Sequence, residues 1–79
     1  MKFNRLVETI AKSIVTEPDV VSVEERKEQD GVVYYVTVAP NDVGKLIGKN
    51  GRVITAIRFF VSAAAAKHRK RAFVKVNTD

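Results

Sequence analysis

The sequence predicts an α+β fold, in which three helices cover one face of a three-stranded mixed sheet. Apolar residues recur at helical spacing in residues 2–16 and 52–67, whereas runs rich in β-branched residues mark residues 20–27, 32–39 and 72–77. The order is helix, strand, strand, helix, helix, strand. It places a helical crossover between the second and third strands, so these two should lie parallel with a right-handed connection.

The first helix is predicted over residues 2–16, because its apolar residues fall on one face: Phe3, Leu6, Val7, Ile10, Ala11, Ile14 and Val15. Glu17-Pro18-Asp19 should end this helix, since the ring of Pro18 disfavours helical geometry at the residue before it.

A hairpin is predicted to follow. Residues 20–27 form its first strand, with Val21 and Val23 on one face and polar residues on the other. Gln29-Asp30-Gly31 is typical of a tight turn, because glycine adopts a positive φ without strain. Residues 32–39 form the second strand.

The second strand should stop at Pro40, and a short helix should run from there through Ile47. Asn41 or Asp42 is the expected N-cap of this helix, since a side-chain oxygen can accept a hydrogen bond from the first free N–H groups. In the last strand, Val74 and Val76 should face the core.

The long helix over residues 52–67 has an apolar arc wider than packing on a sheet requires. Its core stripe is Val53, Ile54, Ile57, Val61, Ala64 and Ala65. At one margin of this stripe lie Ala56, Phe59, Phe60 and Ala63, which are candidates for a dimer interface, because small residues beside an aromatic ring allow two helices to approach closely. Alternatively, Phe59 packs beneath the N-terminal helix and the alanines simply favour helix formation.

Composition excludes several classes of function. The chain has no cysteine and one histidine, His68, so no metal or cofactor is expected and a reducing cytoplasm is the predicted location. No apolar run approaches the ~20 residues of a membrane span, and the N-terminus lacks a signal-peptide core. The glycine spacing fits neither a P-loop nor a dinucleotide fingerprint, and no catalytic constellation can be assembled, which argues against an enzyme.

Charge is divided unevenly along the chain. Residues 1–42 hold five Lys/Arg and eight Asp/Glu, a net charge of −3, whereas residues 43–79 hold nine Lys/Arg and Asp79 as their one acid, a net charge of +8. This polarisation predicts a basic surface suited to phosphate groups. Lys67-His68-Arg69-Lys70-Arg71 is the densest run of charge. Its cations complement a helix C-terminus, and whether they also contact a phosphate-bearing ligand stays open.

The strongest motif lies in residues 43–57, where Gly44, Gly48 and Gly51 fall within eight residues. Gly48-Lys49-Asn50-Gly51 should be a tight turn between two helices with a cation at its tip. Such a turn allows the backbone to approach an anion, and the N–H groups that open the second helix point toward it.

The pattern I-G-x-x-G-x-x-I-x-x-I resembles the signature of KH domains, and the element order resembles their type II arrangement. The block Asp42 to Arg52 with Ala56-Ile57-Arg58 is most similar to small bacterial single-KH proteins of the KhpA (YlqC-like) family. The resemblance spans essentially the whole chain, residues 1–79, as one KH domain. It implies a loop that clamps about four nucleotides of single-stranded nucleic acid, with RNA preferred over DNA.

The candidate RNA-binding residues are Val43, Gly44, Lys45, Leu46, Ile47, Gly48, Lys49, Asn50, Gly51, Arg52 and Ile54. Lys49 and Arg52 supply charge for phosphates, and Asn50 twists the loop or binds a backbone oxygen. The resemblance further implies an apolar groove floor of Val43, Leu46, Ile47 and Ile54. Because the loop and its neighbours contain no aromatic residue, we expect micromolar or weaker affinity and loose sequence preference.

The family resemblance also implies a homodimer, or a heterodimer with a larger Jag-type KH protein, and a role in post-transcriptional regulation or as an RNA chaperone. Two alternatives stay open. The chain is a protein-interaction module with little nucleic-acid binding, or it binds single-stranded DNA.

Overall fold

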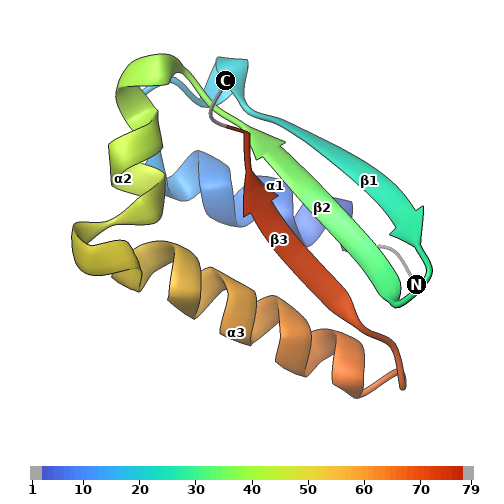
Figure 1. Cartoon of the computed structure of the whole chain (residues 1–79). Helices are drawn as coiled ribbons and strands as arrows, with labels where there is room; N and C mark the ends of the chain where they lie inside the picture. The colour runs from blue at the N-terminus through green and yellow to red at the C-terminus, as the bar shows by residue number, and fades with distance from the viewer. Residues whose placement is uncertain (1–2, 78–79) are drawn as a thin grey trace.

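The computed structural model describes residues 3–77 and confirms the predicted fold class (Figure 1). Its helices and strands are α1 (Asn4–Ile14), β1 (Ser22–Glu28), β2 (Gly31–Thr37), α2 (Val43–Ile47), α3 (Arg52–Ala66) and β3 (Ala72–Val76). Short 3-10 turns precede β1, α2 and α3: η1 (Pro18–Val20), η2 (Pro40–Asp42) and η3 (Lys49–Gly51).

The sheet has β2 at its centre, with β1 antiparallel on one side and β3 parallel on the other. Glu28 pairs with Gly31, which leaves a two-residue hairpin turn. Gly31 has a φ of 150°, and a Cβ there would lie 2.5 Å from the carbonyl oxygen of Arg71. This glycine is therefore required both by the turn and by the close approach of the chain that enters β3.

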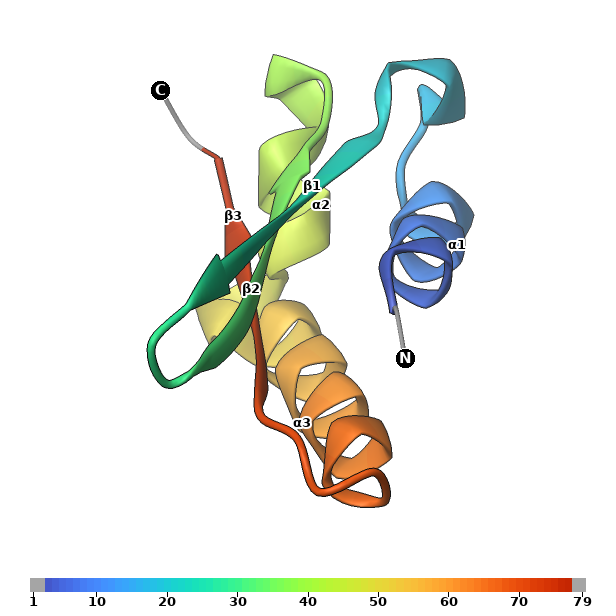
Figure 2. The same cartoon turned by 90° about the vertical axis from the view of Figure 1, so that its right-hand side faces the viewer.

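The core lies between the sheet and the three helices, which occupy one side of it (Figure 2). Tyr34 and Val36 of β2 and Val74 of β3 face this side and are almost fully buried. The phenol oxygen of Tyr34 accepts a hydrogen bond from the backbone N–H of Phe3 at 3.0 Å, so the start of α1 is tied to the central strand. As predicted, Val74 belongs to the core, and Val76 packs against it.

Several predicted boundaries need correction. The N-terminal helix begins at Asn4 and ends at Ile14, because Val15 has extended backbone angles; residues 1 and 2 lie outside the described part of the chain. The first strand begins at Ser22 rather than at residue 20, since Pro18–Val20 form a 3-10 turn. The second strand ends at Thr37 and the long helix at Ala66.

The expected N-cap of α2 is right in position, because Asp42 is the N-cap residue, but wrong in its hydrogen bonds. Neither Asn41 nor Asp42 caps the helix with its side chain. Asp42 is fully buried and binds the α1–β1 connection instead: Oδ1 accepts hydrogen bonds from the N–H and the hydroxyl of Thr16 at 3.0 and 2.8 Å, and Oδ2 accepts one from the N–H of Glu17 at 3.1 Å. Burial alone would raise the pKa of Asp42, but these hydrogen bonds outweigh it, so the pKa lies below its usual value.

Candidate nucleic-acid interface

The turn between α2 and α3 has a backbone in which three of four residues have a positive φ. The φ angles are 80° at Gly48, 57° at Asn50 and 75° at Gly51. The N–H of Gly48 donates to the carbonyl of Gly44 at 2.8 Å and closes α2, and the N–H of Gly51 donates to the carbonyl of Gly48 at 3.1 Å and closes the turn. The loop is therefore a defined structure that reverses the chain in four residues.

The three glycines of the motif are needed for different reasons. A Cβ at Gly48 would collide with the side chain of Val53, so the fold itself requires this glycine. Gly51 has left-handed angles but open space around it. Gly44 has neither constraint: it is exposed, and no atom lies within 4 Å of a Cβ placed there. Packing therefore leaves Gly44 unexplained, and a bare helix surface remains beside the loop.

The N-terminus of α3 begins at this loop and is open to an anion. No side chain caps it, and no acidic residue lies in its first turn. The first N–H groups of a helix lack intrahelical partners and carry partial positive charge. Since α3 has 15 residues, its macrodipole is well developed. The N–H groups of Gly51 and Arg52 donate to the carbonyls of Gly48 and Lys49, so what the helix terminus offers an anion is the partial positive charge of its macrodipole.

Cationic side chains surround this helix terminus. Lys45, Lys49 and Arg52 are all exposed. Within residues 3–77 the two ion pairs, Lys12–Glu8 and Arg26–Glu24, lie elsewhere, so none of these three cations is held in an ion pair with a described acidic group. The charge of Lys45 does help to lower the pKa of Asp42. The loop thus combines the partial positive charge of a helix terminus with the full positive charges of three side chains.

The apolar floor predicted beside the loop is smaller than expected. Val43 and Ile47 are half-buried and still reach the surface. Leu46 and Ile54 are 1% and 6% exposed, because they fill the junction between α2, α3 and the sheet. The prediction that Leu46 and Ile54 contact bases is therefore corrected: in this conformation they support the groove from below.

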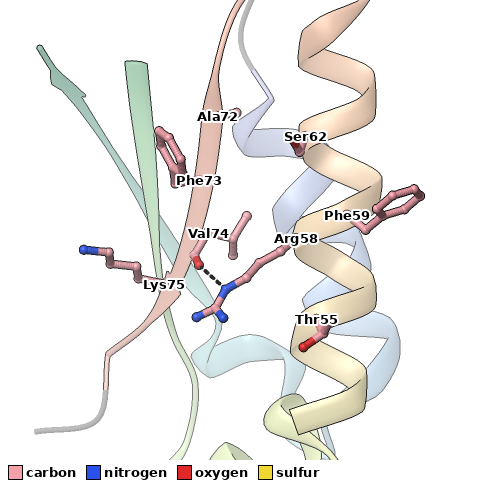
Figure 3. Close-up of a pocket in the computed structure, with 8 residues that line it drawn as sticks. All are labelled: Thr55, Arg58, Phe59, Ser62, Ala72, Phe73, Val74 and Lys75. Atoms are coloured by element: carbon pink, nitrogen blue, oxygen red, sulfur yellow. Dashed lines mark hydrogen bonds between the residues drawn. The ribbon is translucent and has the colours of Figure 1, made fainter. Parts of the chain in front are cut away.

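A cleft of about 550 Å³ lies between α3 and β3 (Figure 3). Arg58 reaches across it from α3, and its Nε–H donates to the carbonyl oxygen of Val74 at 2.9 Å. Phe59 and Phe73 stand at its rims. The sequence interpretation missed this cleft because Phe73 is far from the glycine motif along the chain; its position between the inward-facing Ala72 and Val74 was the available signal.

The outer face of α3 carries the four residues of the predicted dimer interface, and all are exposed: Ala56, Phe59, Phe60 and Ala63. The alternative that Phe59 packs beneath α1 is wrong, because its side chain is 77% exposed. The two rings border different clefts. Phe59 lies at the β3 side, whereas Phe60 adjoins Phe3 and His68, whose rings are 6.2 Å apart.

The cationic run 67–71 forms a tight turn at the opposite end of α3. Arg69 has a φ of 58°, and the N–H of Lys70 donates to the carbonyl of Ala65 at 3.0 Å. All five side chains are exposed. At 1.5 Å per helical residue, this turn lies about 24 Å from Gly51.

A fold of this order, with a G-x-x-G turn at the junction of two helices, defines a KH domain of the type II arrangement. The family model described as KhpA/KhpB, KH domain, matches residues 4–76, and the chain belongs to this family.

Curated relatives carry the name RNA-binding protein KhpA. That of Caldanaerobacter subterraneus subsp. tengcongensis is 48% identical over 71 residues, covering 90% of this chain and 95% of the relative. That of Clostridium acetobutylicum is 47% identical over 72 residues, covering 91% and 96%. That of Oceanobacillus iheyensis is 42% identical over 71 residues, covering 90% and 95%. Among solved structures, none matches the chain significantly.

Two further properties concern the described part of the chain. None of its helices is long and apolar enough to cross a membrane. Its His, Asp and Glu side chains also form no group of three or more that could hold a metal ion.

Proposed function

We propose that this chain is a non-catalytic RNA-binding protein whose G-x-x-G loop clamps the backbone of about four nucleotides of single-stranded RNA. The observation that carries the proposal is the uncapped N-terminus of α3 behind a loop with three positive φ angles and Lys49 at its tip. The names of the curated relatives support the same ligand.

In this mechanism the backbone holds one phosphate and side chains hold its neighbours. The partial positive charge at the N-terminus of α3 attracts a phosphate, and the exposed Gly44 leaves room for the sugar-phosphate chain. Lys49 and the Arg52 guanidinium neutralise charge, while Val43 and Ile47 contact base faces. Roughly four phosphate contacts imply a log–log salt slope of about −3.

Charge reversal in the loop tests this clamp. In Lys49→Asp/Asn50→Asp, affinity for a random single-stranded RNA should fall by about tenfold or more, because two donors become repulsive groups. Fluorescence polarisation across a salt series measures the effect. Arg5→Asp/Thr9→Asp on α1 introduces the same change of charge at exposed positions and should bind normally. Circular dichroism checks that both fold. Equal binding by the loop variant and its parent would refute the clamp.

A single-stranded DNA of the same sequence, measured with the parent protein, tests whether RNA is preferred.

We also propose that a second copy, or a larger KH protein, docks on the outer face of α3. The strip of Ala56, Phe60 and Ala63 is exposed, and Phe60 is 53% exposed beside an apolar cleft of about 410 Å³ against Phe3. Because α3 contains no acidic residue, two copies that meet through it bring like charges together. Self-association should therefore strengthen with salt, whereas RNA binding weakens.

Phe60→Asp tests this second surface. The charge should weaken self-association by about thirtyfold, as expected for an aromatic group at the centre of an interface. Sedimentation equilibrium at low and high salt measures the change, and Val20→Asp, at an exposed apolar residue of η1 rather than α3, provides the control. If Phe60→Asp self-associates like the parent, this strip is not the interface.

We place this activity in the cytoplasm, where the single domain would act in post-transcriptional regulation or as an RNA chaperone. Annealing and strand-exchange rates of short RNAs, with and without the protein, would separate chaperone activity from simple binding.

A further inference from the structure

We propose that the cationic turn 67–71 is a second RNA-binding site, which holds a separate strand while the glycine loop clamps the first. In this way one molecule brings two RNA strands together and promotes their annealing. This inference rests on the proposed function and gives its chaperone activity a structural basis.

The backbone of this turn favours glycine at a position where the chain has arginine. The N–H of Arg69 donates to the carbonyl of Ala66 at 2.9 Å, and the N–H of Lys70 donates to the carbonyl of Ala65 at 3.0 Å. These two bonds form a Schellman motif, whose left-handed residue is usually glycine. Arg69 occupies that position with a φ of 58°, which is strained for a residue with a long side chain. Strain at an exposed residue indicates that its side chain serves a function.

The helix dipole accounts for only part of the charge in the turn. The effect of the macrodipole falls off within the last turn of a helix. Because α3 ends at Ala66, Lys67 lies where a cation stabilises the helix, whereas Lys70 and Arg71 follow the closing motif and lead into β3. The two ion pairs of residues 3–77 lie in α1 and β1, so no described acidic group pairs with these cations.

A second element contributes to the same charged surface. A shallow hollow of about 470 Å³ lies between the turn and the tip of the β1–β2 hairpin. The charged residues that line it are four cations and two acids: Lys27, Arg69, Lys70 and Arg71, with Glu28 and Asp30. The cations outnumber the acids and come from both elements. Such a converging positive surface is suited to the phosphates of a nucleic acid.

The turn and the clamp are two separate charged regions. They lie at opposite ends of α3 (Figure 1), about 24 Å apart at 1.5 Å per helical residue. Between Arg52 and Lys67 the one cation of the helix is Arg58, whose Nε–H already donates to the carbonyl of Val74. The neighbouring strand β3 adds only Lys75. Positive charge is therefore concentrated at the two ends of α3, which favours two bound strands over one continuous path.

The side chains of the turn suit a strand that must still form base pairs. The turn contains no Phe, Tyr or Trp, and the ring of His68 lies against that of Phe3, with 6.2 Å between their centroids. Lys and Arg side chains bind phosphates and leave the base edges free. A strand held in this way can pair with the nucleotides that flank the clamped segment. Their shared attachment to one protein raises the effective concentration of each strand for the other.

Energy transfer between two labelled strands tests this arrangement. Two non-complementary single-stranded RNAs of about twelve nucleotides, one with a donor and one with an acceptor dye, are titrated with the protein. The parent should bring them together and raise the transfer. Arg69→Gly/Lys70→Ser removes two cations, and glycine suits the positive φ at position 69. This variant should need about tenfold more protein for half-maximal transfer, yet bind a four-nucleotide RNA like the parent.

Two control variants separate the turn from other causes of bridging. Lys12→Gln/Arg26→Gln removes the same amount of charge from exposed positions in α1 and β1 and should bridge the strands like the parent. A dimer can also bridge two strands through its two clamps, and Phe60→Asp removes that route by weakening self-association. If the turn is the second site, Phe60→Asp keeps the bridging. Annealing rates of complementary RNAs should rank the variants in the same order.

Three results would overturn the second site. Bridging that survives in Arg69→Gly/Lys70→Ser but is lost in Phe60→Asp would assign both strands to the clamps of a dimer. An equal loss in Lys12→Gln/Arg26→Gln would reduce the effect to net charge. A parent that binds one strand and never bridges two would leave the clamp intact without a second site, whereas a parent that binds no RNA would refute the clamp as well.

Discussion

The two ends of α3 are both tight turns with positive φ angles, but different groups supply their positive charge. At the N-terminal end, Gly48, Asn50 and Gly51 bend the backbone, and the positive end of the α3 macrodipole lies beside one lysine. At the C-terminal end, Arg69 alone in the turn has a positive φ, and four Lys and Arg side chains supply the charge. The positive end of a helix dipole has a fixed position, whereas a long side chain can move its charge over several ångströms. The first end can set the register of a ligand, and the second can attract it.

The largest effect is expected for Gly48→Ala, at the N-terminal end of α3. Its angles, φ 80° and ψ 171°, belong to a region that L-residues avoid, and a Cβ would collide with Val53. We expect Gly48→Ala to lower the free energy of unfolding by about 2 kcal/mol or more and to abolish RNA binding. Denaturant unfolding followed by circular dichroism measures the first effect.

Gly44→Ala is the matched control for that change. It meets no neighbour and lies inside α2, so it should stabilise the fold by up to about 1 kcal/mol while weakening RNA binding. Equal stability of the two alanine variants would show that the loop backbone is not constrained as described.

Arg69→Gly tests the turn at the C-terminal end of α3. Arginine at φ 58° is strained, so Arg69→Gly should stabilise the fold by about 1 kcal/mol, as measured by the denaturant midpoint at constant m-value. Asn50→Gly, at φ 57°, should give a smaller gain because asparagine tolerates this region better. A loss of stability in Arg69→Gly would mean that the arginine side chain holds the turn together.

The smallest effect on stability concerns the buried carboxylate of Asp42. This group supports α2, near the N-terminal end of α3, and no such group lies at the C-terminal end of α3 in the described residues. Its pKa is lowered in the folded state, so its stabilisation is present above the unfolded value of about 3.9 and is lost as pH falls through the lower folded pKa. The melting temperature should therefore drop below about pH 4. Asp42→Asn should show a shallower drop, with Arg69→Gly as a control that keeps the parental dependence. If the melting temperature of Asp42→Asn falls at low pH as far as that of the parent, the fall is due to other carboxylates.

Local patterns were sufficient to predict the elements, the parallel pairing and the glycine turn, because periodicity and turn chemistry act over a few residues. Contacts between distant segments were not predictable in this way. Asp42 looked like a helix cap, but its partners Thr16 and Glu17 lie about 25 residues earlier. The cleft between Phe59 and Phe73 likewise exists only because the chain crosses back from α3 to β3.

The depth of the groove was the other point that the sequence left undetermined. Leu46 and Ile54 have the same hydrophobic character as Val43 and Ile47, and the spacing of a short helix does not separate floor from core. Their burial depends on how α2 meets α3 and the sheet, which is a property of packing. The positions of the loop residues, by contrast, followed from the glycines alone.

The hydrogen bond from Arg58 to Val74 also affects how the sheet ends. The carbonyl of Arg71 and the N–H of Asn77 bond to β2, so by alternation the carbonyl of Val74 points away from the sheet. Such outward groups can recruit a strand from another molecule and start aggregation. By occupying this carbonyl, Arg58 removes one point of attachment on the β3 edge, while charged residues along β1 discourage pairing at the opposite edge. A small domain with two exposed edges is thereby protected from indefinite growth of its sheet.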